Sequence, residues 1–259
     1  MAHDERRRPV WVGVATFAVL IVAWFALTTW TSTIGPGRFP SPREAFDALR
    51  QIWVQGYADA RLPVHALHSA KLVLLGFVAA VGLGVPLGLA MGWSRTCEAF
   101  ANPTFLLLRP IPPLAWIPLA IVWLGLGDAA KVLVIWFAAF VPAVINSYSG
   151  VRSIEPHLVE AARTLGVSRR RMVTEVLIPG ALPMIFGGLR LSLQACWTTL
   201  VAAELIGAIA GLGHVLYQAS LDLFPAMIVV GMVAVAVTAA LMTIALDIVE
   251  RRAMPWRRA

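Results

Sequence analysis

The chain has 259 residues, of which 59% are hydrophobic and only 14% are charged. An average soluble domain carries about 25% charged residues, and a single core in a chain of this length could not bury so much apolar surface. The composition therefore excludes an ordinary soluble enzyme, a disordered chain and a small disulfide-bonded scaffold. It is typical of a protein that crosses a membrane several times.

The sequence has an excess of positive charge but no motif for binding nucleic acid or metal. The net charge is +7, from 21 Lys and Arg against 14 Asp and Glu. No basic cluster is interleaved with aromatic residues, so we expect no nucleic-acid partner. Cys97 and Cys196 have no metal-ligand spacing, and no cluster of His, Cys and carboxylate residues predicts a metal site.

Six apolar segments are long enough for a helix of about 20 residues that crosses a bilayer. Four runs have no charge at all, 9–37, 72–94, 132–151 and 223–246, and one arginine interrupts each of the runs 99–127 and 176–203. None alternates with the period of a barrel strand, which predicts an all-α membrane protein. The expected spans are 10–30, 69–93, 100–126, 130–150, 181–206 and 224–247.

Six spans place both termini on the same side of the membrane. The loops and tails of that side hold Arg6, Arg7, Arg8, Arg95, Arg152, Arg163, Arg169, Arg170, Arg171, Arg251, Arg252, Arg257 and Arg258. The opposite loops and their flanks hold Arg38, Arg43, Arg50, Arg61, Lys71 and Lys131. Since cytoplasmic loops carry the excess of Lys and Arg, we expect both termini in the cytoplasm.

Residues 1–259 are predicted to form one transmembrane domain. The apolar stretch of the first span is too long for a signal peptide, so we expect an uncleaved anchor. In the first outer loop, Ser41 is suited to cap a helix and Pro42 to begin it. Apolar residues at helical spacing follow, which predicts a helix over 41–54 that lies on the outer membrane surface.

The most informative segment is the loop 152–183, between the fourth and fifth spans. Pro156 suits a first helical turn, and Gly166 suits the left-handed residue that follows a helix, which predicts a short helix over 156–166. Apolar residues recur in it at i, i+3, i+4 and i+7, namely Leu158, Ala161, Ala162 and Leu165. So short a helix is unstable alone, and its apolar stripe calls for a partner groove.

The same loop carries a family motif. Glu160-Ala161-Ala162, three residues, Gly166, nine residues and then Val176-Leu177-Ile178-Pro179 resembles the EAA motif of permease subunits in bacterial, binding-protein-dependent ABC importers. The usual motif ends in Ile-x-Leu-Pro, so the ending here is a conservative departure. The resemblance runs from about Leu67 to the C-terminus. The stretches 109–118, 179–183 and 199–205 most resemble the taurine, aliphatic sulfonate, nitrate and bicarbonate branch.

The resemblance implies a type I importer permease in the bacterial inner membrane. The helix 156–166 would be the coupling helix, which docks on a separate ATP-binding cassette ATPase; the implied contact residues are Glu160, Ala161, Ala162, Leu165, Gly166 and Pro179. The implied partners are two ATPase copies, a periplasmic or lipid-anchored substrate-binding protein and a second copy of this chain. Without the motif, an amphipathic helix on lipid headgroups would explain the loop equally well, with Arg169, Arg170 and Arg171 on the phosphates.

Ionisable residues inside spans are costly and indicate function by default. Arg109 and Arg190 each lie about ten residues into a span, and two guanidinium groups that face a common path would favour an anion. Gln194 and Thr198 follow Arg190 at helical spacing and complete that face. The alternative is structural, because the prolines around Arg109 free backbone carbonyls that its side chain can bind.

Glu204 and the proline cluster leave similar alternatives open. Pro110, Pro112, Pro113 and Pro118 should break the third span, and a broken backbone at this depth must face protein or a cavity. Glu204 lies near the outer end of the fifth span. It is our fifth candidate pathway residue, although it could instead cap the turn at 207–213 or pair with an arginine.

The chain has no Gly-x4-Gly-Lys-Ser/Thr loop, so we expect no ATPase activity and no cofactor on this chain, with ATP and magnesium bound by the partner. The preferred function is a permease subunit for a taurine-like or sulfonate-like anion. Nitrate, bicarbonate, an aromatic carboxylate or a pyrimidine-type solute are alternatives within the same machinery. An ATP-independent anion transporter and a membrane scaffold are alternatives of other classes.

Overall fold

The computed structural model describes residues 10–30, 39–207 and 210–258. Within these ranges the chain is helical, apart from turns and an isolated bridge between Tyr57 and Ala60. The α-helices are α1 (Val10–Phe25), α2 (Pro42–Val54), α3 (Leu62–Trp93), α4 (Arg95–Leu108), α5 (Ile117–Leu124), α6 (Asp128–Arg152), α7 (Pro156–Thr164), α8 (Arg169–Arg171), α9 (Ile178–Gly207), α10 (Leu212–Leu221) and α11 (Pro225–Ala253).

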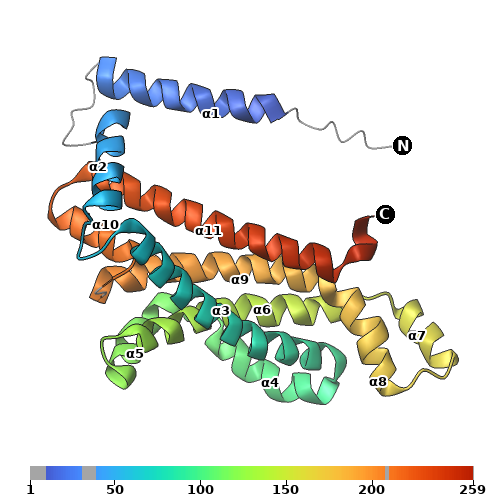
Figure 1. Ribbon diagram of the computed structural model, residues 1–259. Coiled ribbons are helices and arrows are strands. Elements are labelled where there is room, and N and C mark those ends of the chain that lie inside the picture. The colour runs from blue at the N-terminus through green and yellow to red at the C-terminus, as the bar shows by residue number, and fades with distance from the viewer. Residues whose placement is uncertain (1–9, 31–38, 208–209, 259) are drawn as a thin grey trace.

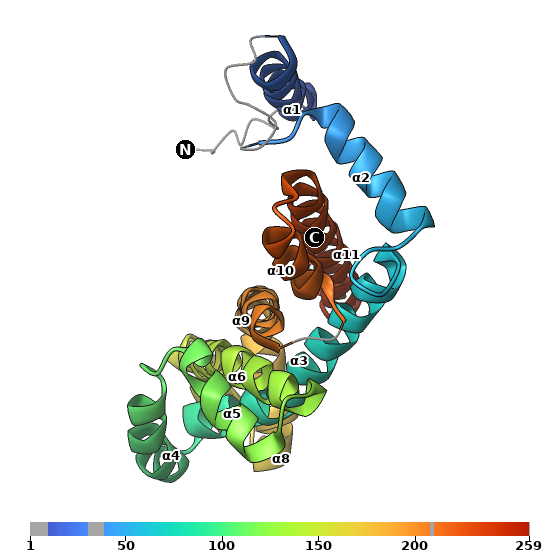
Figure 2. The ribbon, with the colours of Figure 1, turned by 90° about the vertical axis from the view of Figure 1, so that its left-hand side faces the viewer.

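The long helices α3, α6, α9 and α11 form the body of the molecule (Figure 1). Helix α6 packs against both α3 and α9, and α10 folds back against α9 and α11. Helices α7 and α8 lie at one end of the bundle, with the end of α11, and α10 lies at the other (Figure 1). We call these the α7 end and the α10 end. Helix α1 stands apart from the bundle in both views (Figure 2).

Among the described residues, four helical segments are long and apolar enough to cross a membrane: Leu62–Trp93, Asp128–Arg152, Arg169–Ile206 and Pro225–Ala253. A fifth is the pair of α4 and α5, which is bent by 84°. The all-α prediction is therefore confirmed for the described residues. The first expected span, 10–30, contains a shorter apolar helix, Ala18–Trp30, so a sixth span stays a prediction.

The helix bounds differ from the bounds of two expected spans. The second span, expected over 69–93, begins at Leu62, because Pro63 starts the helix and the polar side chains of its first turns are used inside the protein. The third expected span, 100–126, is broken into two helices after Leu108, as the proline cluster predicted. Before α2, Ser41 caps the helix and Pro42 begins it, as the sequence predicted, and Glu44 adds a capping box that the sequence analysis did not name.

A stripe of small residues lets α3 approach α6 at backbone distance. Gly76, Ala80, Gly84, Gly88 and Gly92 recur every fourth residue, which places them on one face of α3. A methyl group on Gly88 would collide with the carbonyl oxygen of Val144 and lie 2.7 Å from Cβ of Ser147. Small residues at this spacing drive helix association in membranes through close packing. The sequence showed the stripe, but our sequence analysis did not use it.

The α6–α9 interface is equally close. A methyl group on Gly150 would lie 3.0 Å from the carbonyl oxygen of Ala181, and Ser192 donates a 2.8 Å hydrogen bond to the carbonyl oxygen of Ala139. Ser192 is fully buried, so this bond satisfies a hydroxyl that has no access to water. Helix α6 is therefore held on two sides with little room for its neighbours to slide.

We expect Gly88→Ala to lower the stability of the folded chain by about 1–3 kcal/mol, the usual cost of overpacking. Gly82 lies on the same helix with nothing within 4 Å of an added methyl group, so Gly82→Ala is the matched control. Thermal unfolding of both variants in detergent, followed by tryptophan fluorescence, measures the difference. Equal midpoints for the two variants would contradict the assigned role of the stripe.

Candidate functional site

Helix α7, the expected coupling helix, ends in a Schellman turn. The amide of Gly166 donates to the carbonyl of Arg163 at 3.0 Å, and the amide of Val167 donates to the carbonyl of Ala162 at 3.1 Å. Gly166 has φ +71°, the left-handed conformation that this turn requires and that glycine adopts without steric cost. The helix over Pro156–Thr164 and the position of its closing glycine thus agree with the residue pattern.

The two faces of α7 have different surroundings. Ala162 is 9% exposed and packs in a cluster with Met172, Leu177 and Ala181. Leu158 and Leu165 point outward, with exposed fractions of 56% and 83%. Glu160 and Ala161 are exposed as well. The predicted apolar stripe is thus divided. Ala162 attaches α7 to the bundle, and the outer stripe of Leu158, Ala161 and Leu165 is left uncovered within the described chain.

The loop after α7 runs into α9 without a break. Residues Arg169–Ile206 form one helical segment of 38 residues, which includes a π-helical turn at Met172–Leu177. In that turn the amide of Ile178 reaches the carbonyl of Val173, five residues earlier. Pro179 follows directly and is half-buried. Helices α8 and α9 are therefore parts of one continuous helical segment.

The bend between α4 and α5 exposes Arg109. This residue caps the end of α4 and is followed by Pro110, Pro112 and Pro113, which cannot continue a regular helix. The Arg109 side chain is exposed, and no ion pair or hydrogen bond to it is found in the described part of the chain. Its charge is thus available to a group from outside the protomer.

An aromatic cleft of about 210 Å³ lies beside Arg109. Trp116 stacks on Phe137 with ring centroids 4.2 Å apart, and Trp136 stacks on Phe140 at 4.8 Å. These four rings and the Arg109 side chain line the cleft, together with residues of α4 and α6. The cleft therefore combines one cation with an apolar wall, an arrangement that suits a small anion with an apolar body.

Arg190 is in a different situation from Arg109. Its Nε donates to Oδ1 of Asp247 at 3.0 Å, and its Nη2 contacts Glu250 as well. Both carboxylates belong to α11, so the guanidinium joins α9 to α11 near the α7 end. Two carboxylates offset its charge, which weakens the case for Arg190 as an anion-binding group. Gln194 and Thr198 lie on the same exposed face of α9.

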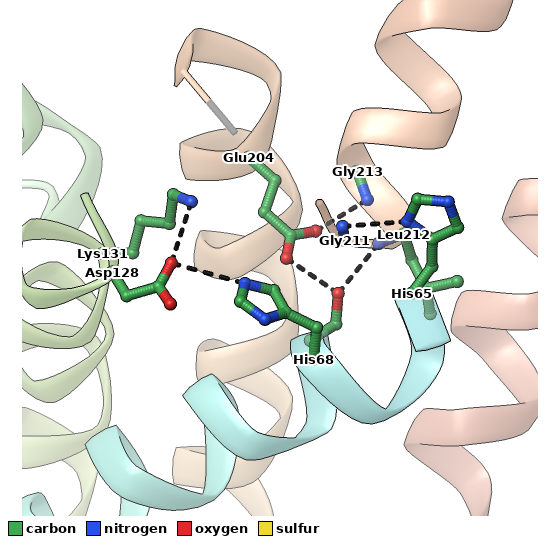
Figure 3. Close-up of polar contacts among 9 residues, drawn as sticks. His65, His68, Asp128, Lys131, Glu204, Gly211, Leu212 and Gly213 are labelled. Carbon is green, nitrogen blue, oxygen red and sulfur yellow. Dashed lines mark hydrogen bonds and ion pairs between the residues drawn. The ribbon is translucent and has the colours of Figure 1, made fainter. Parts of the chain in front are cut away.

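Glu204 lies inside the protomer and binds the start of α10 (Figure 3). It is 0% exposed. Its Oε2 accepts the amide of Gly213 at 2.7 Å, and its Oε1 accepts the hydroxyl of Ser69 at 2.7 Å. Ser69 in turn accepts the amide of Leu212 at 2.8 Å. A carboxylate in this position would be costly without such donors. Of the five candidate pathway residues, Glu204 is the one that the protomer buries.

His65 completes this network. Its Nδ1 accepts the amide of Gly211 at 3.1 Å (Figure 3). Its Nε2 therefore carries the proton and donates to the carbonyl of Tyr57 at 2.9 Å. Three successive amides at the start of α10 are therefore bound by α3 and α9 side chains. Our sequence analysis missed His65 and Ser69; their spacing of four residues on α3 was the available signal.

A second polar group lies beside the first. Asp128, at the start of α6, contacts the Lys131 ammonium and the Nε2 of His68, each at 3.3 Å (Figure 3). Lys131 is nearly buried. The α10 end of the molecule is thus held by polar contacts from α3, α6, α9 and α10. Arg109 and Arg190 have no part in this network.

Comparisons with known proteins identify the family to which this helical chain belongs. Residues 82–258 match the model of the family described as "Binding-protein-dependent transport system inner membrane component". The chain belongs to this family. The permease is 38% identical over 250 residues to the taurine transport system permease protein TauC of Escherichia coli strain K12, which covers 96% of this chain and 90% of TauC.

Two further likenesses concern function and fold. The permease is 32% identical over 208 residues to the nitrate import permease protein NrtB of a Synechocystis species, with 78% of this chain and 74% of NrtB covered. It resembles an inward-facing structure of the MetNI methionine ABC transporter with a TM-score of 0.61, at 22% identity, over 74% of this chain and 95% of that one. The permease is a membrane subunit of an ABC importer and has the fold of such subunits.

We expect Glu204→Ala to destabilise the permease by about 1–3 kcal/mol, because the buried amide of Gly213 and the hydroxyl of Ser69 lose their acceptor. Gly211→Ala should have a similar effect, since its methyl group would collide with the Glu204 carboxylate. Glu175→Ala, on an exposed side chain, is the control. Thermal unfolding in detergent gives all three values; a Glu204→Ala midpoint equal to that of the control would contradict the assignment.

Proposed function

We propose that two copies of this permease form the translocation path of an importer for a small anion, driven by two copies of a separate ATPase. A binding protein delivers the solute from outside. The observation that carries the proposal is the uncovered stripe of Leu158, Ala161 and Leu165 on a helix whose end is already closed by its own turn. A short helix with an exposed apolar face is suited to a groove on a partner protein.

In this proposal the α7 end faces the cytoplasm of a bacterial cell, and helix α1 is the first of six spans in the inner membrane. Both termini then lie in the cytoplasm, in agreement with the distribution of arginines. Closure of the ATPase dimer displaces α7, and α6 and the continuous α8–α9 segment carry that displacement into the bundle. ATP and magnesium bind to the ATPase, and the permease itself holds no cofactor.

We assign a taurine-like sulfonate as the preferred solute and nitrate or bicarbonate as the alternatives within the same machinery. TauC and NrtB, to which the chain is similar, are named for taurine and nitrate transport. All three anions present oxygens that a guanidinium binds in pairs. Arg109 supplies that group, with Gln194 and Thr198 as polar residues of the path. Arg190 and Glu204 act on the path through the helices that they join.

Gly166→Asp tests the docking of α7. Nothing lies within 4 Å of an added Cβ at this position, so a side chain there meets no neighbouring atom of the permease. The left-handed φ of +71° adds backbone strain to any residue other than glycine, and aspartate is among the residues that tolerate it best. We expect Gly166→Asp to insert and fold, to lose the ATPase on affinity purification in mild detergent, and to lose uptake. Glu175→Gln should keep both. A Gly166→Asp permease that retains the ATPase and normal uptake would refute the docking assignment.

Replacing Arg109 separates the two arginines by function. We expect Arg109→Gln to leave the fold intact and to lower anion uptake at least tenfold in proteoliposomes, because a charge-assisted bond contributes about 1.5–3 kcal/mol. Arg190→Gln should instead lower the yield of folded dimer, since nearly buried Glu250 loses a cationic partner. Uptake of labelled taurine and size-exclusion profiles measure the two effects. Normal uptake by Arg109→Gln would contradict its place in the path.

A further inference from the structure

A polar cluster at the α7 end joins the start of α4 to the end of α6. Glu98 lies in the first turn of α4, and Tyr148 and Arg152 lie in the last turns of α6. Oε1 of Glu98 accepts the Tyr148 hydroxyl at 2.5 Å, and Oε2 accepts the Arg152 guanidinium. The guanidinium also lies 5.6 Å from the centroid of the Tyr148 ring. Each of the three side chains therefore contacts the other two.

The cluster is more than a surface ion pair. The Glu98 side chain is 23% exposed and Tyr148 is half-buried, whereas the Arg152 side chain is 47% exposed. Directly beneath it, Phe105 and Ala101 of α4 pack with Val144 of α6 and Met91 of α3. A carboxylate shielded in this way and bound by two partners holds its geometry better than an exposed pair does. Helix α4 is thus attached to α6 by polar contacts at its start and by Phe105 further along.

The position of the cluster connects two parts of the molecule. Arg152 is the last residue of α6, and α7 begins four residues later at Pro156. At the other end of α4, Phe105 lines the aromatic cleft, and Arg109 follows one turn later at the bend. Arg152, Glu98 and helix α4 thus lie between the start of α7 and Arg109 along a chain of direct contacts.

We propose that Glu98 is a positioning residue, which transmits displacement of α7 through Arg152 to α4 and thereby to the bend at Arg109. The inference rests on the proposed function, because it requires α7 to dock on the ATPase. If the link through Glu98 is weakened, α4 is held to α6 only by the Phe105 contacts and follows it less closely. The ATPase then still binds and turns over, but less anion is moved for each ATP hydrolysed.

The test measures this ratio. Glu98→Gln, Arg152→Gln and the exchanged pair Glu98→Arg with Arg152→Glu are purified with the ATPase and reconstituted with binding protein in proteoliposomes. Glu175→Gln is the matched control, because Glu175 forms an exposed pair with Arg171 on the same side of the molecule. ATP hydrolysis, uptake of labelled taurine and the unfolding temperature are measured for each complex.

We expect both single variants to keep the ATPase and at least half of its hydrolysis rate, while uptake per ATP falls about fivefold or more. The exchanged pair should recover most of that ratio, and Glu175→Gln should not change it. An unchanged ratio in Glu98→Gln overturns the proposal, as does a fall in unfolding temperature without a change in the ratio. A folded exchanged pair that stays uncoupled overturns it too.

The two proposals fail in distinguishable ways. If Gly166→Asp retains the ATPase and normal uptake, α7 is not the docking helix and the transmission route has no starting point. If Gly166→Asp loses the ATPase while Glu98→Gln couples normally, docking on α7 stands and the role of Glu98 alone is wrong.

Discussion

The close contact between α3 and α6 is the constraint on which the rest of the molecule depends. With no side chain beyond a methyl group on the stripe of α3, the two backbones touch, and α6 has no freedom to shift along its neighbour. The opposite side of α6 is held by α9 in the same manner. The two ends of α6 therefore keep a fixed relation. One end carries the Asp128 contacts of the α10 end, and the other carries Arg152 and leads into α7.

The close packing of the helices also determines how the polar residues of the bundle are paired. A charge that lies among the spans is costly unless it has polar partners, and here these partners lie on other helices or at helix ends. Glu204 finds backbone amides, and Arg190 finds two carboxylates of α11. Arg109 differs because the proline-induced bend leaves it at an open cleft. The contrast separates charges that assemble the permease from the charge that is available to a solute.

The features that the sequence predicted correctly are local. Ser41 with Pro42, and Pro156 with Gly166, define helix ends through residues only a few positions apart, and the apolar runs define the long helices through composition. The partners of Arg190 lie 57 and 60 residues further along the chain, and Ser69 lies 135 residues before Glu204. Such pairings depend on how helices are arranged in space, which no pattern in one sequence encodes directly. The direction of α7 also required the structure, because its stripe is divided between two surfaces.

The closed turn of α7 has a consequence for how such a transporter diversifies. Because the helix is terminated by its own backbone and is attached to the bundle through Ala162, its outward side chains carry almost none of the folding stability. Under the proposed docking of α7, selection can therefore alter Leu158 or Leu165 to suit a different ATPase subunit without loss of the permease fold. The residues that select the ATPase can then change independently of the residues that hold the permease together. Duplicated transporters in one cell can thereby come to bind each its own ATPase and no other.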